Sequence, residues 1–177
     1  MTTKQLLIIG AGGHGRAVAE AVLRQQAYAL TAFLDDAAQP NQRVWNWPVW
    51  GTTSMLGQCR DKVDAVFVAI GNNALRQALH QLVQAEQIEL ATVIHPSAIV
   101  SPSAVVERGC AIMAGAVVGP DARICEGAIV NSGAVVDHDC VVEPFGHLGV
   151  NAAIAGGSVL GHSAWMPAGA VLAYGAK

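Results

Sequence analysis

A repeat of six residues constrains the second half of this chain more than any other feature. From residue 98 onward, the third residue of every six is Val, Ile, Leu or Met, thirteen times without a break. These residues are Val100, Val106, Ile112, Val118, Ile124, Val130, Val136, Val142, Leu148, Ile154, Leu160, Met166 and Leu172. An α-helix repeats about every 3.6 residues and an ordinary strand about every two, so neither requires a strict period of six. The repeat predicts a parallel β-helix, in which every six residues contribute one short strand to one face.

A second position in the repeat supports the same fold. The first residue of every six is Ala, Cys, Gly or Ser, as at Ala98, Ala104 and Cys110. We expect the aliphatic position to point into the coil. The small position should lie near a corner, where a larger side chain would clash with the layers above and below. Three repeats close one triangular coil of about 18 residues, so the sequence predicts about four coils.

The first half of the chain has the pattern of an α/β domain. The elements that we expect are strands at residues 4–10, 31–34, 64–70 and 90–94 and helices at 16–26, 54–60 and 74–86. The first strand, a glycine-rich turn, a helix and the second strand make a βαβ unit. The sequence therefore predicts a Rossmann-like α/β domain over residues 1–96. It is joined without a long linker to a β-helix over residues 97–177.

Composition and charge narrow the partners and the compartment. The formal net charge is -3, which argues against nucleic acid or an anionic membrane as a partner. The sequence contains no uncharged apolar run long enough to span a membrane. Its apolar first segment leads into a glycine turn and not into a cleavage site, so we interpret it as a strand and not as a signal peptide. The four cysteines form no C-x-x-C pair, so we expect reduced thiols in a cytoplasmic protein. We expect no metal site, because the histidines lack the supporting partners that metal ligands need.

The glycine-rich turn leaves two classes of ligand open. Gly10, Gly12 and Gly15 match the dinucleotide pattern G-x-G-x-x-G, and Asp35 lies twenty residues after Gly15. However, glycines at the start of a helix let its N–H groups approach any diphosphate, including that of a UDP-sugar. Four expected strands are fewer than the six of a dinucleotide site, which favours a nucleotide sugar over NAD. His14, inside this turn, either caps and packs the loop or donates a hydrogen bond to the diphosphate or to a sugar hydroxyl.

The strongest candidate for chemistry is His138, which lies between Asp137 and Asp139. It comes two residues after the inward Val136, so we expect it to face outward at a corner of the coil. A neighbouring carboxylate raises the basicity of an imidazole, which a general base for acyl transfer requires. The chain has no G-x-S-x-G pattern and no reactive cysteine paired with a histidine. We therefore predict direct attack of a bound amine or hydroxyl on a thioester.

Several segments resemble a known family. They are GAGGHG at Gly10–Gly15, FLDD at Phe33–Asp36, AIGNNALR at Ala69–Arg76, IHPSA at Ile94–Ala98, and NSGAVVDHDC through FGHLGV at Asn131–Val150. On these residues the sequence resembles the two-domain hexapeptide-repeat sugar acetyltransferases. This family includes the UDP-4-amino-sugar N-acetyltransferases of bacillosamine synthesis and the sialic acid O-acetyltransferases. The resemblance covers essentially the whole chain. It implies a left-handed β-helix, a homotrimer, a nucleotide sugar in the first domain, and acetyl-CoA in a groove between neighbouring β-helices.

The resemblance also implies a role for each matching residue. His138 would be the general base and Asp139 the acidic residue that raises its basicity. His147 would contact the thioester end of acetyl-CoA, and Ala168 would contribute backbone to the same site. The residues implied for the nucleotide sugar are Gly12, Gly13, His14, Asp35, Asp36 and Gly71. Because His147 follows His138 by half a coil, the two would line one groove only across a trimer interface.

The end of the sequence departs from the family pattern. Relatives continue for about another coil and close with a Gly-x-Pro-Ala segment, whereas this sequence ends at Lys177 within the repeat. We therefore expect binding of acetyl-CoA to be weaker than the fold alone implies. The favoured function is acetyl transfer from acetyl-CoA to the amino group of a nucleotide-linked amino sugar. The alternatives are O-acetylation of a sugar such as sialic acid, and a weakened or non-catalytic subunit that binds a nucleotide sugar.

Overall fold

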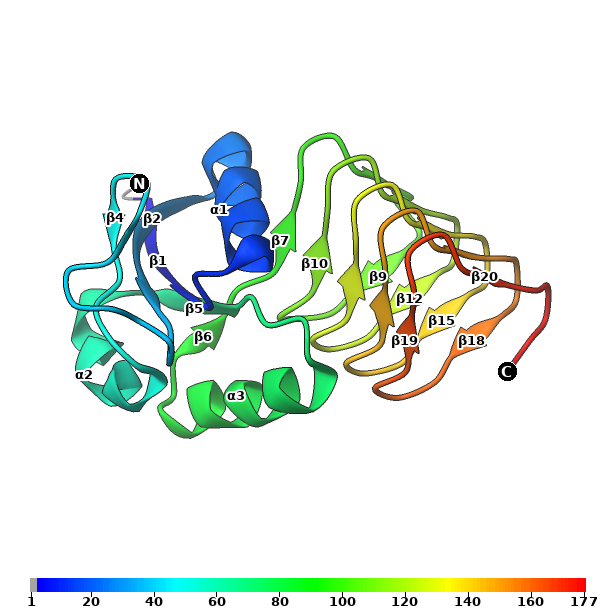
Figure 1. The fold of residues 1–177 in the computed structure, drawn as a ribbon. Coiled ribbons are helices and arrows are strands. Elements are labelled where there is room, and N and C mark those ends of the chain that lie inside the picture. Colours follow the sequence, from blue (N-terminus) through cyan, green and yellow to red (C-terminus); the bar gives the residue numbers. More distant parts are fainter. Residues whose placement is uncertain (1–2) are drawn as a thin grey trace. The chain divides into compact units, whose positions relative to one another are not determined.

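The computed structural model describes residues 3–177 and divides the chain into two compact units (Figure 1). The division falls between Ala91 and Thr92, a few residues before the predicted boundary at residue 96. The reason is strand β7 (Val93–Ile94), which pairs with β10 (Ala111–Ile112) of the repeat. The single strand predicted over residues 90–94 is therefore split, and its second half belongs to the β-helix.

A parallel four-stranded sheet forms the centre of the first unit, in the order β2-β1-β5-β6. Its strands are β1 (Lys4–Ile9), β2 (Tyr28–Leu34), β5 (Ala65–Val68) and β6 (Glu89–Leu90). Residues 6–9 of β1 are fully buried, as their apolar sequence predicts. The number of strands in this sheet agrees with the prediction from the sequence.

Helices lie on both sides of this sheet. Figure 1 shows α1 (Gly13–Gln25) on one side and α3 (Asn73–Ala85) on the other. The buried residues Leu79 and Val83 of α3 share a core cluster with alternate residues of β1. Helix α1 begins at Gly13, three residues before the predicted start, so part of the glycine-rich motif is the first turn of the helix.

Short elements connect β2 to β5. They are the strands β3 (Arg43–Val44) and β4 (Trp47–Pro48), the 3-10 helices η1 (Thr53–Met55) and η2 (Arg60–Lys62), and the helix α2 (Leu56–Cys59). Strands β3 and β4 pair in an antiparallel hairpin whose turn contains the exposed Trp45. The single helix predicted near residues 54–60 is thus broken into three short turns.

The second unit is a parallel β-helix, as the repeat predicts. Over residues 92–177 it has fourteen strands of two residues each, arranged in three parallel sheets. Paired residues are 18 apart in the sequence, as in the pairs Val117 with Val135 and Val135 with Ala153. One coil therefore takes 18 residues, which confirms the predicted period.

We name each of these sheets by its first strand. The β7 sheet contains β7, β10, β13 (Ile129–Val130), β16 (His147–Leu148) and β19 (Trp165–Met166). The β8 sheet contains β8 (Ile99–Val100), β11 (Val117–Val118), β14 (Val135–Val136), β17 (Ala153–Ile154) and β20 (Val171–Leu172). The β9 sheet contains β9 (Val105–Val106), β12 (Arg123–Ile124), β15 (Val141–Val142) and β18 (Val159–Leu160).

The core of the β-helix is built from two positions of the repeat. The second residue of each strand is the predicted aliphatic position, and Ile112, Ile124 and Val136 are among those fully buried there. The small position, as at Cys110 and Ala116, is buried in the same cluster. Successive side chains of a strand point to opposite faces, so the first residue of each strand faces outward. Both predicted roles are confirmed.

A left-handed backbone conformation at the sixth position of the repeat turns the chain at the corners. Twelve residues at this position have positive φ, namely seven glycines and Asp121, Asp139, Phe145, Asn151 and Ser163. A hydrogen bond from the following residue closes the turn, as from Ala116 N–H to the Met113 carbonyl (3.1 Å). A type II β-turn has this pattern. With only seven glycines among the corners, the sequence does not mark the position clearly.

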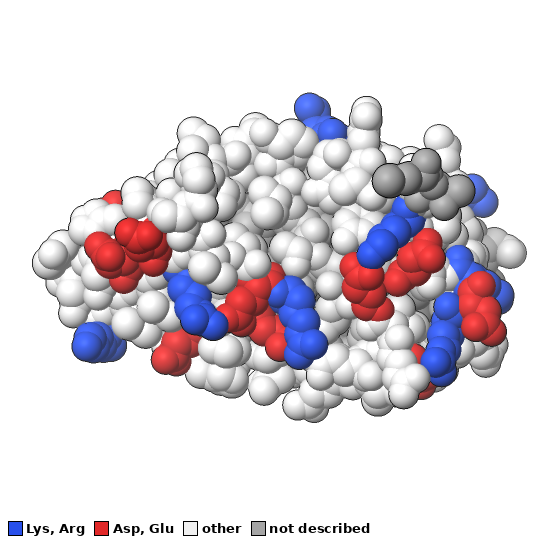
Figure 2. All heavy atoms as spheres, turned by 180° about the vertical axis from the view of Figure 1, so that it is seen from behind, with Lys and Arg blue, Asp and Glu red and all other residues white. Residues whose placement is uncertain are grey.

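Charged side chains on the surface lie in mixed groups. Figure 2 shows Lys and Arg beside Asp and Glu over the face that it presents. On the β-helix, Arg108 pairs with Glu126 at 2.9 Å, and Arg123 pairs with Glu107. Each pair joins successive coils, so the stacking of coils decides which charges meet.

Candidate functional site

His138 and Asp139 form a hydrogen-bonded pair at a corner of the β-helix, directly after β14. His138 Nδ1 lies 2.8 Å from Asp139 Oδ2, and the imidazole is about half exposed. A carboxylate accepts and does not donate, so Nδ1 carries the proton in this bond. In the neutral imidazole, Nε2 then holds the lone pair. The outward position predicted for His138 is confirmed.

Two carboxylates raise the basicity of this histidine. The hydrogen bond that His138 donates to Asp139 contributes most to raising the pKa of His138 above its ordinary value, and the charge of Asp137 adds to it. Asp137 Oδ2 lies 3.9 Å from His138 Nε2. A small loss of solvation acts in the opposite direction. The arrangement is that of a general base with an orienting acid.

The corner turn brings Asp139 against the imidazole. Asp139 has a φ of 56°, in the left-handed region that short polar residues such as Asp tolerate better than most. His138 N–H donates to Asp137 Oδ1 at 2.8 Å, and Asp139 N–H donates to the Pro120 carbonyl of the preceding coil at 3.0 Å. The pair therefore stands on a turn that is fixed from within and from the neighbouring coil.

The residues predicted to bind acetyl-CoA lie elsewhere on the β-helix. His147 is in β16, on the β7 sheet, and only 9% of it is exposed. Ala168 is exposed at the corner that follows β19 of the same sheet. His138 follows the β8 sheet, so the β8 sheet separates this corner from that of Ala168. One chain does not bring these three residues together, as the sequence predicts for His147.

The glycines of the N-terminal motif serve two different purposes. A Cβ on Gly15 would lie 1.9 Å from the Gly10 carbonyl oxygen, and one on Gly10 would lie 2.7 Å from the Ala69 carbonyl oxygen. The fold itself excludes side chains at these two positions. A Cβ on Gly12 or Gly13 would meet nothing within 4 Å. The open space lies at the N-terminus of α1, where N–H groups and the helix dipole favour an anion.

His14 is the second residue of α1, directly after this open position. Its placement in the helix rather than in a preceding loop differs from the expected glycine turn. Whether the His14 side chain packs against the protein or donates a hydrogen bond to a ligand stays open. The role of His14 in binding a nucleotide sugar stays a prediction.

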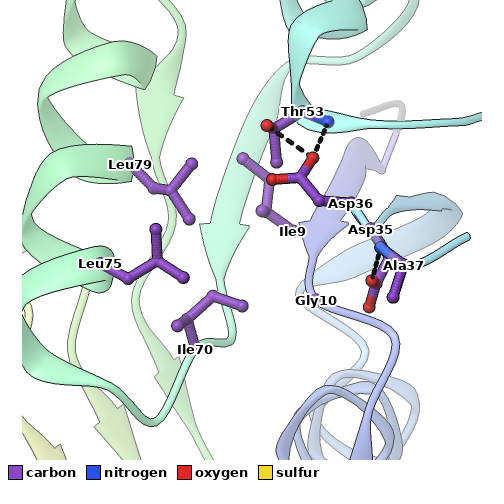
Figure 3. Close-up of a pocket in the computed structure, with 9 residues that line it drawn as sticks. All are labelled: Ile9, Gly10, Asp35, Asp36, Ala37, Thr53, Ile70, Leu75 and Leu79. Carbon is purple, nitrogen blue, oxygen red and sulfur yellow. Dashed lines mark hydrogen bonds between the residues drawn. The ribbon is translucent and has the colours of Figure 1, made fainter.

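The two aspartates after β2 have distinct contacts (Figure 3). Asp35 accepts a hydrogen bond from Ala11 N–H at 2.7 Å with one oxygen and from Ala37 N–H at 2.8 Å with the other. Asp36 accepts from the N–H and the hydroxyl of Thr53, both at 2.8 Å and both with the same oxygen. Asp35 therefore holds the glycine-rich loop in place, while Asp36 keeps a second oxygen available.

A pocket with a volume of about 210 Å³ lies beside these aspartates. Its lining residues are Ile9, Gly10, Asp35, Asp36, Ala37, Thr53, Ile70, Leu75 and Leu79. In Figure 3, Leu75 and Leu79 of α3 and Ile70, which follows β5, lie on one side of the pocket, and Asp36 lies on the other. A flat heterocycle that carries N–H donors matches such a lining, since apolar walls take its faces and the second oxygen of Asp36 takes a donor.

Arg76, a buried residue of α3, had no predicted role of its own. It is fully buried in α3 and donates to the carbonyls of Ile70 (2.9 Å) and Gly71 (3.2 Å) and to the Asn73 side chain (2.9 Å). It thus fixes the turn that contains the predicted site residue Gly71. The available signal was an arginine on the apolar stripe of a predicted helix, three residues before Leu79.

Among residues 3–177, no group of three or more His, Cys, Asp or Glu side chains is placed to hold a metal ion. Within the same residues, no helix is long and apolar enough to cross a membrane.

Comparison with known families identifies both units. Residues 5–83 match the PglD N-terminal domain family, and residues 103–138 match the bacterial transferase hexapeptide family of six repeats. A curated relative, UDP-N-acetylbacillosamine N-acetyltransferase of Bacillus subtilis (strain 168), is 35% identical over 112 residues. That match covers 63% of this chain and 52% of the relative, so the matched part spans about half of the relative's length.

Solved structures resemble the chain over nearly its whole length. A point mutant of GDP-perosamine N-acetyltransferase of Caulobacter crescentus, in complex with CoA and GDP-perosamine, is 38% identical, with a TM-score of 0.92. The match covers 98% of this chain and 82% of that one. The acetyltransferase domain of PglB from Neisseria gonorrhoeae, in complex with acetyl coenzyme A, is 34% identical, with a TM-score of 0.90 and coverages of 98% and 84%.

These matches define the class of protein, a hexapeptide-repeat transferase with a left-handed β-helix. The chain belongs to the family of two-domain sugar N-acetyltransferases that carry a PglD N-terminal domain. The resemblance noted in the sequence is thereby confirmed, as is the fold class.

Proposed function

We propose that this protein transfers an acetyl group from acetyl-CoA to the amino group of a nucleotide-linked amino sugar of the 4-amino-4,6-dideoxy type. The observation that carries the proposal is the His138–Asp139 pair, bonded at 2.8 Å and exposed at a corner of the β-helix. The relatives described above are N-acetyltransferases of nucleotide-linked amino sugars or bind acetyl coenzyme A. They support amine acetylation over the acetylation of a hydroxyl.

The proposed chemistry needs one base and no covalent enzyme intermediate. The amine nitrogen attacks the thioester carbonyl, a C–N bond forms, the C–S bond breaks, and CoA leaves as the thiol. His138 Nε2 takes the proton that the nitrogen loses and passes it to the departing sulfur. Asp139 keeps the imidazole oriented through Nδ1 and stabilises the imidazolium that forms.

The first unit supplies the proposed site for the nucleotide part of the acceptor. We propose that the diphosphate lies at the open N-terminus of α1, over Gly12 and Gly13 and beside His14. The base then enters the pocket lined by Asp36, and Asp35 and Gly71 contribute by shaping the surrounding loops. The lack of any packing reason for glycine at positions 12 and 13 supports this assignment.

We propose that the protein is a homotrimer and that neighbouring copies complete the acetyl-CoA site. The outward residues of the β8 sheet are all apolar, namely Ile99, Val117, Val135, Ala153 and Val171. Ile99 is 67% exposed and Val171 73% exposed, so this face offers continuous apolar surface to another copy. The same sheet separates the corners of His138 and Ala168. A second copy against it would bring its own His147 or Ala168 toward His138.

The trimer proposal is tested at the β8 sheet. Val135→Asp places a charge in the proposed interface, and we expect light scattering after size exclusion to report monomers. Val105→Asp, which places the same charge at an exposed position of the β9 sheet, is the matched control and should leave the assembly intact. Trimers in both variants would show that the interface lies on another face, and a monomeric parent protein would contradict the proposal.

The four cysteines are unpaired thiols, which supports a cytoplasmic location.

The reaction is tested by release of free thiol from acetyl-CoA with three acceptors: a UDP-4-amino sugar, a GDP-4-amino sugar and sialic acid. We expect release with one nucleotide-linked amino sugar and none with sialic acid. His138→Ala should lower kcat by about 10² to 10⁴, the usual contribution of a general base. His162→Ala, which removes another exposed histidine of the β-helix, is the control. If His138→Ala turns over as fast as the parent protein, His138 is not the general base.

A further inference from the structure

The coils of the β-helix place four residues in one column at the corner of the proposed base. Residues 18 apart occupy equivalent places in successive coils, so Pro120, His138, Gly156 and Tyr174 lie one above another. Backbone hydrogen bonds join these layers, from Gly157 N–H to the His138 carbonyl (3.0 Å) and from Gly175 N–H to the Gly156 carbonyl (3.1 Å). The environment of the His138 imidazole is therefore set by the residues one and two coils further along the chain.

The imidazole of His138 occupies space that a side chain at residue 156 would take. A Cβ on Gly156 would lie 2.5 Å from His138 Nε2 and 2.6 Å from Cε1. Both distances are far below van der Waals contact, so the two groups exclude each other. Tyr174 bounds the space from the next coil, with its ring centroid 6.5 Å from that of His138. The imidazole therefore extends over Gly156, toward the layer of Tyr174.

The backbone does not require glycine at this position. Gly156 is not among the residues with positive φ, whereas Gly157, the sixth residue of the repeat, has a φ of 68°. An alanine at 156 would thus fit the turn, and the three atoms nearest to its Cβ all belong to the exposed His138 imidazole. The glycine matters for where the imidazole lies rather than for the path of the chain.

We infer that Gly156 is a positioning residue for His138: its missing side chain provides the space in which the imidazole can keep its hydrogen bond to Asp139. This rests on the proposed function of His138 as the base. The titratable groups that face the imidazole are Asp139 at 2.8 Å, Asp137 at 3.9 Å and, across the gap over Gly156, Tyr174. A displaced imidazole loses the first of these contacts and points Nε2 away from the acceptor.

The test compares Gly156→Ala with Gly161→Ala in the full-length chain. Gly161 is also in the β-helix, has no positive φ, and a Cβ there would meet only Glu143 Oε2, at 4.0 Å. The first measurement is the NMR titration of the His138 imidazole. We expect its pKa to fall toward the ordinary histidine value in Gly156→Ala and to stay raised in Gly161→Ala. The titration does not require catalytic turnover, so it tests the positioning role of Gly156 even if the proposed reaction is wrong.

The second measurement is the rate of acetyl transfer, with the acceptor that supports thiol release in the assay proposed above. A catalytic group displaced by about an ångström can lose about 10²-fold in rate. We therefore expect kcat to fall by about 10- to 100-fold in Gly156→Ala, with KM for the nucleotide sugar nearly unchanged, and no change in Gly161→Ala. An unaltered imidazole pKa together with an unaltered kcat in Gly156→Ala would overturn the inference.

A double variant separates the positioning role from a role in folding. In His138→Ala/Gly156→Ala the overlapping imidazole is gone, so we expect the thermal unfolding midpoint of His138→Ala alone. If the double variant unfolds at a much lower temperature, the glycine is needed by the backbone and the inference is wrong.

Discussion

The two units of the chain relate sequence to structure in different ways. In the β-helix, the environment of a residue follows from its place in the six-residue repeat, because its neighbours in the next coil are always 18 residues away. In the α/β unit, residues of one short motif have unlike environments. Gly15 packs against the backbone of Gly10, while Gly13 faces open space. A regular stack thus makes sequence position a reliable guide, whereas an α/β fold assigns roles through contacts with distant segments.

The alternation of inward and outward residues in the β-helix predicts the largest difference in stability. Ile124 is fully buried in the core, whereas Val105, on the same sheet, is 52% exposed. Ile124→Ala should lower the free energy of unfolding by about 2–5 kcal/mol, because it removes buried methylene groups and leaves a cavity. Val105→Ala should change it by less than about 0.5 kcal/mol. Urea unfolding of both variants measures these changes. Equal losses of unfolding free energy would show that inward and outward positions of the repeat do not differ in their contribution to stability.

The unlike glycines of the α/β unit predict a smaller but clearer contrast. Gly15→Ala forces a methyl group into the Gly10 carbonyl and should cost about 1–3 kcal/mol or more of folding free energy. Gly13→Ala has open space and a better helix former, so its stability should be unchanged or slightly higher. Calorimetry should then show that Gly13→Ala binds the nucleotide sugar more weakly, because the ligand approaches this backbone. Unchanged affinity of Gly13→Ala for the nucleotide sugar would contradict the proposal that the diphosphate binds at this loop.

The corner turn of the β-helix predicts a shift in the pH dependence of the reaction. Asp139 raises the pKa of His138, so the unprotonated base, and with it the rate, develops at a pH above the ordinary histidine pKa of about 6.5. Asp139→Asn removes the main cause, and the inflection of kcat/KM should move to lower pH. The plateau rate at high pH should fall, since the imidazole loses its orienting partner. If the inflection of kcat/KM stays at the same pH in Asp139→Asn, Asp139 does not raise the pKa of the catalytic base.

The ion pairs between coils predict the smallest effect. Arg108 and Glu126 meet at 2.9 Å, but the Arg108 side chain is 59% exposed. Exposed pairs of this kind contribute about 0–1 kcal/mol. Arg108→Ala should therefore lower the unfolding free energy by less than about 1 kcal/mol, and the loss should disappear at high salt. A larger, salt-independent loss would show that the stack depends on its charges.

Sequence patterns predicted the main architecture of both units. The repeat predicted the period of 18, the buried aliphatic position and the outward placement of His138. The βαβ pattern predicted the sheet of the first unit. The short helical turns over residues 53–62 and the early start of α1 were not predicted, because weak local propensities there yield to packing on the sheet. The unit boundary shifted because Val93 pairs with a strand of the next coil.

The candidate site shows the same division between what was predictable and what was not. The sequence indicated His138 and Asp139, since a histidine between two acidic residues is visible in one dimension. It indicated Asp35 and Asp36 as a pair, but the structure gives them different contacts, with backbone N–H groups in one case and with Thr53 in the other. Arg76 and Gly156 had no such signal, because an arginine in a helix or a glycine in a repeat has many explanations.

By itself, the sequence determined the repeat, the parallel stacking of the strands and the candidate for the base, because these depend on residues that are adjacent or at a fixed period. Only the tertiary structure decided which glycines face open space, which carboxylate oxygens are already used, and how closely the imidazole approaches the residue in the next coil. These properties depend on atoms brought together from separate coils or strands. The physical reason is that steric exclusion and hydrogen-bond saturation act over a few ångströms in space, whatever the distance along the chain.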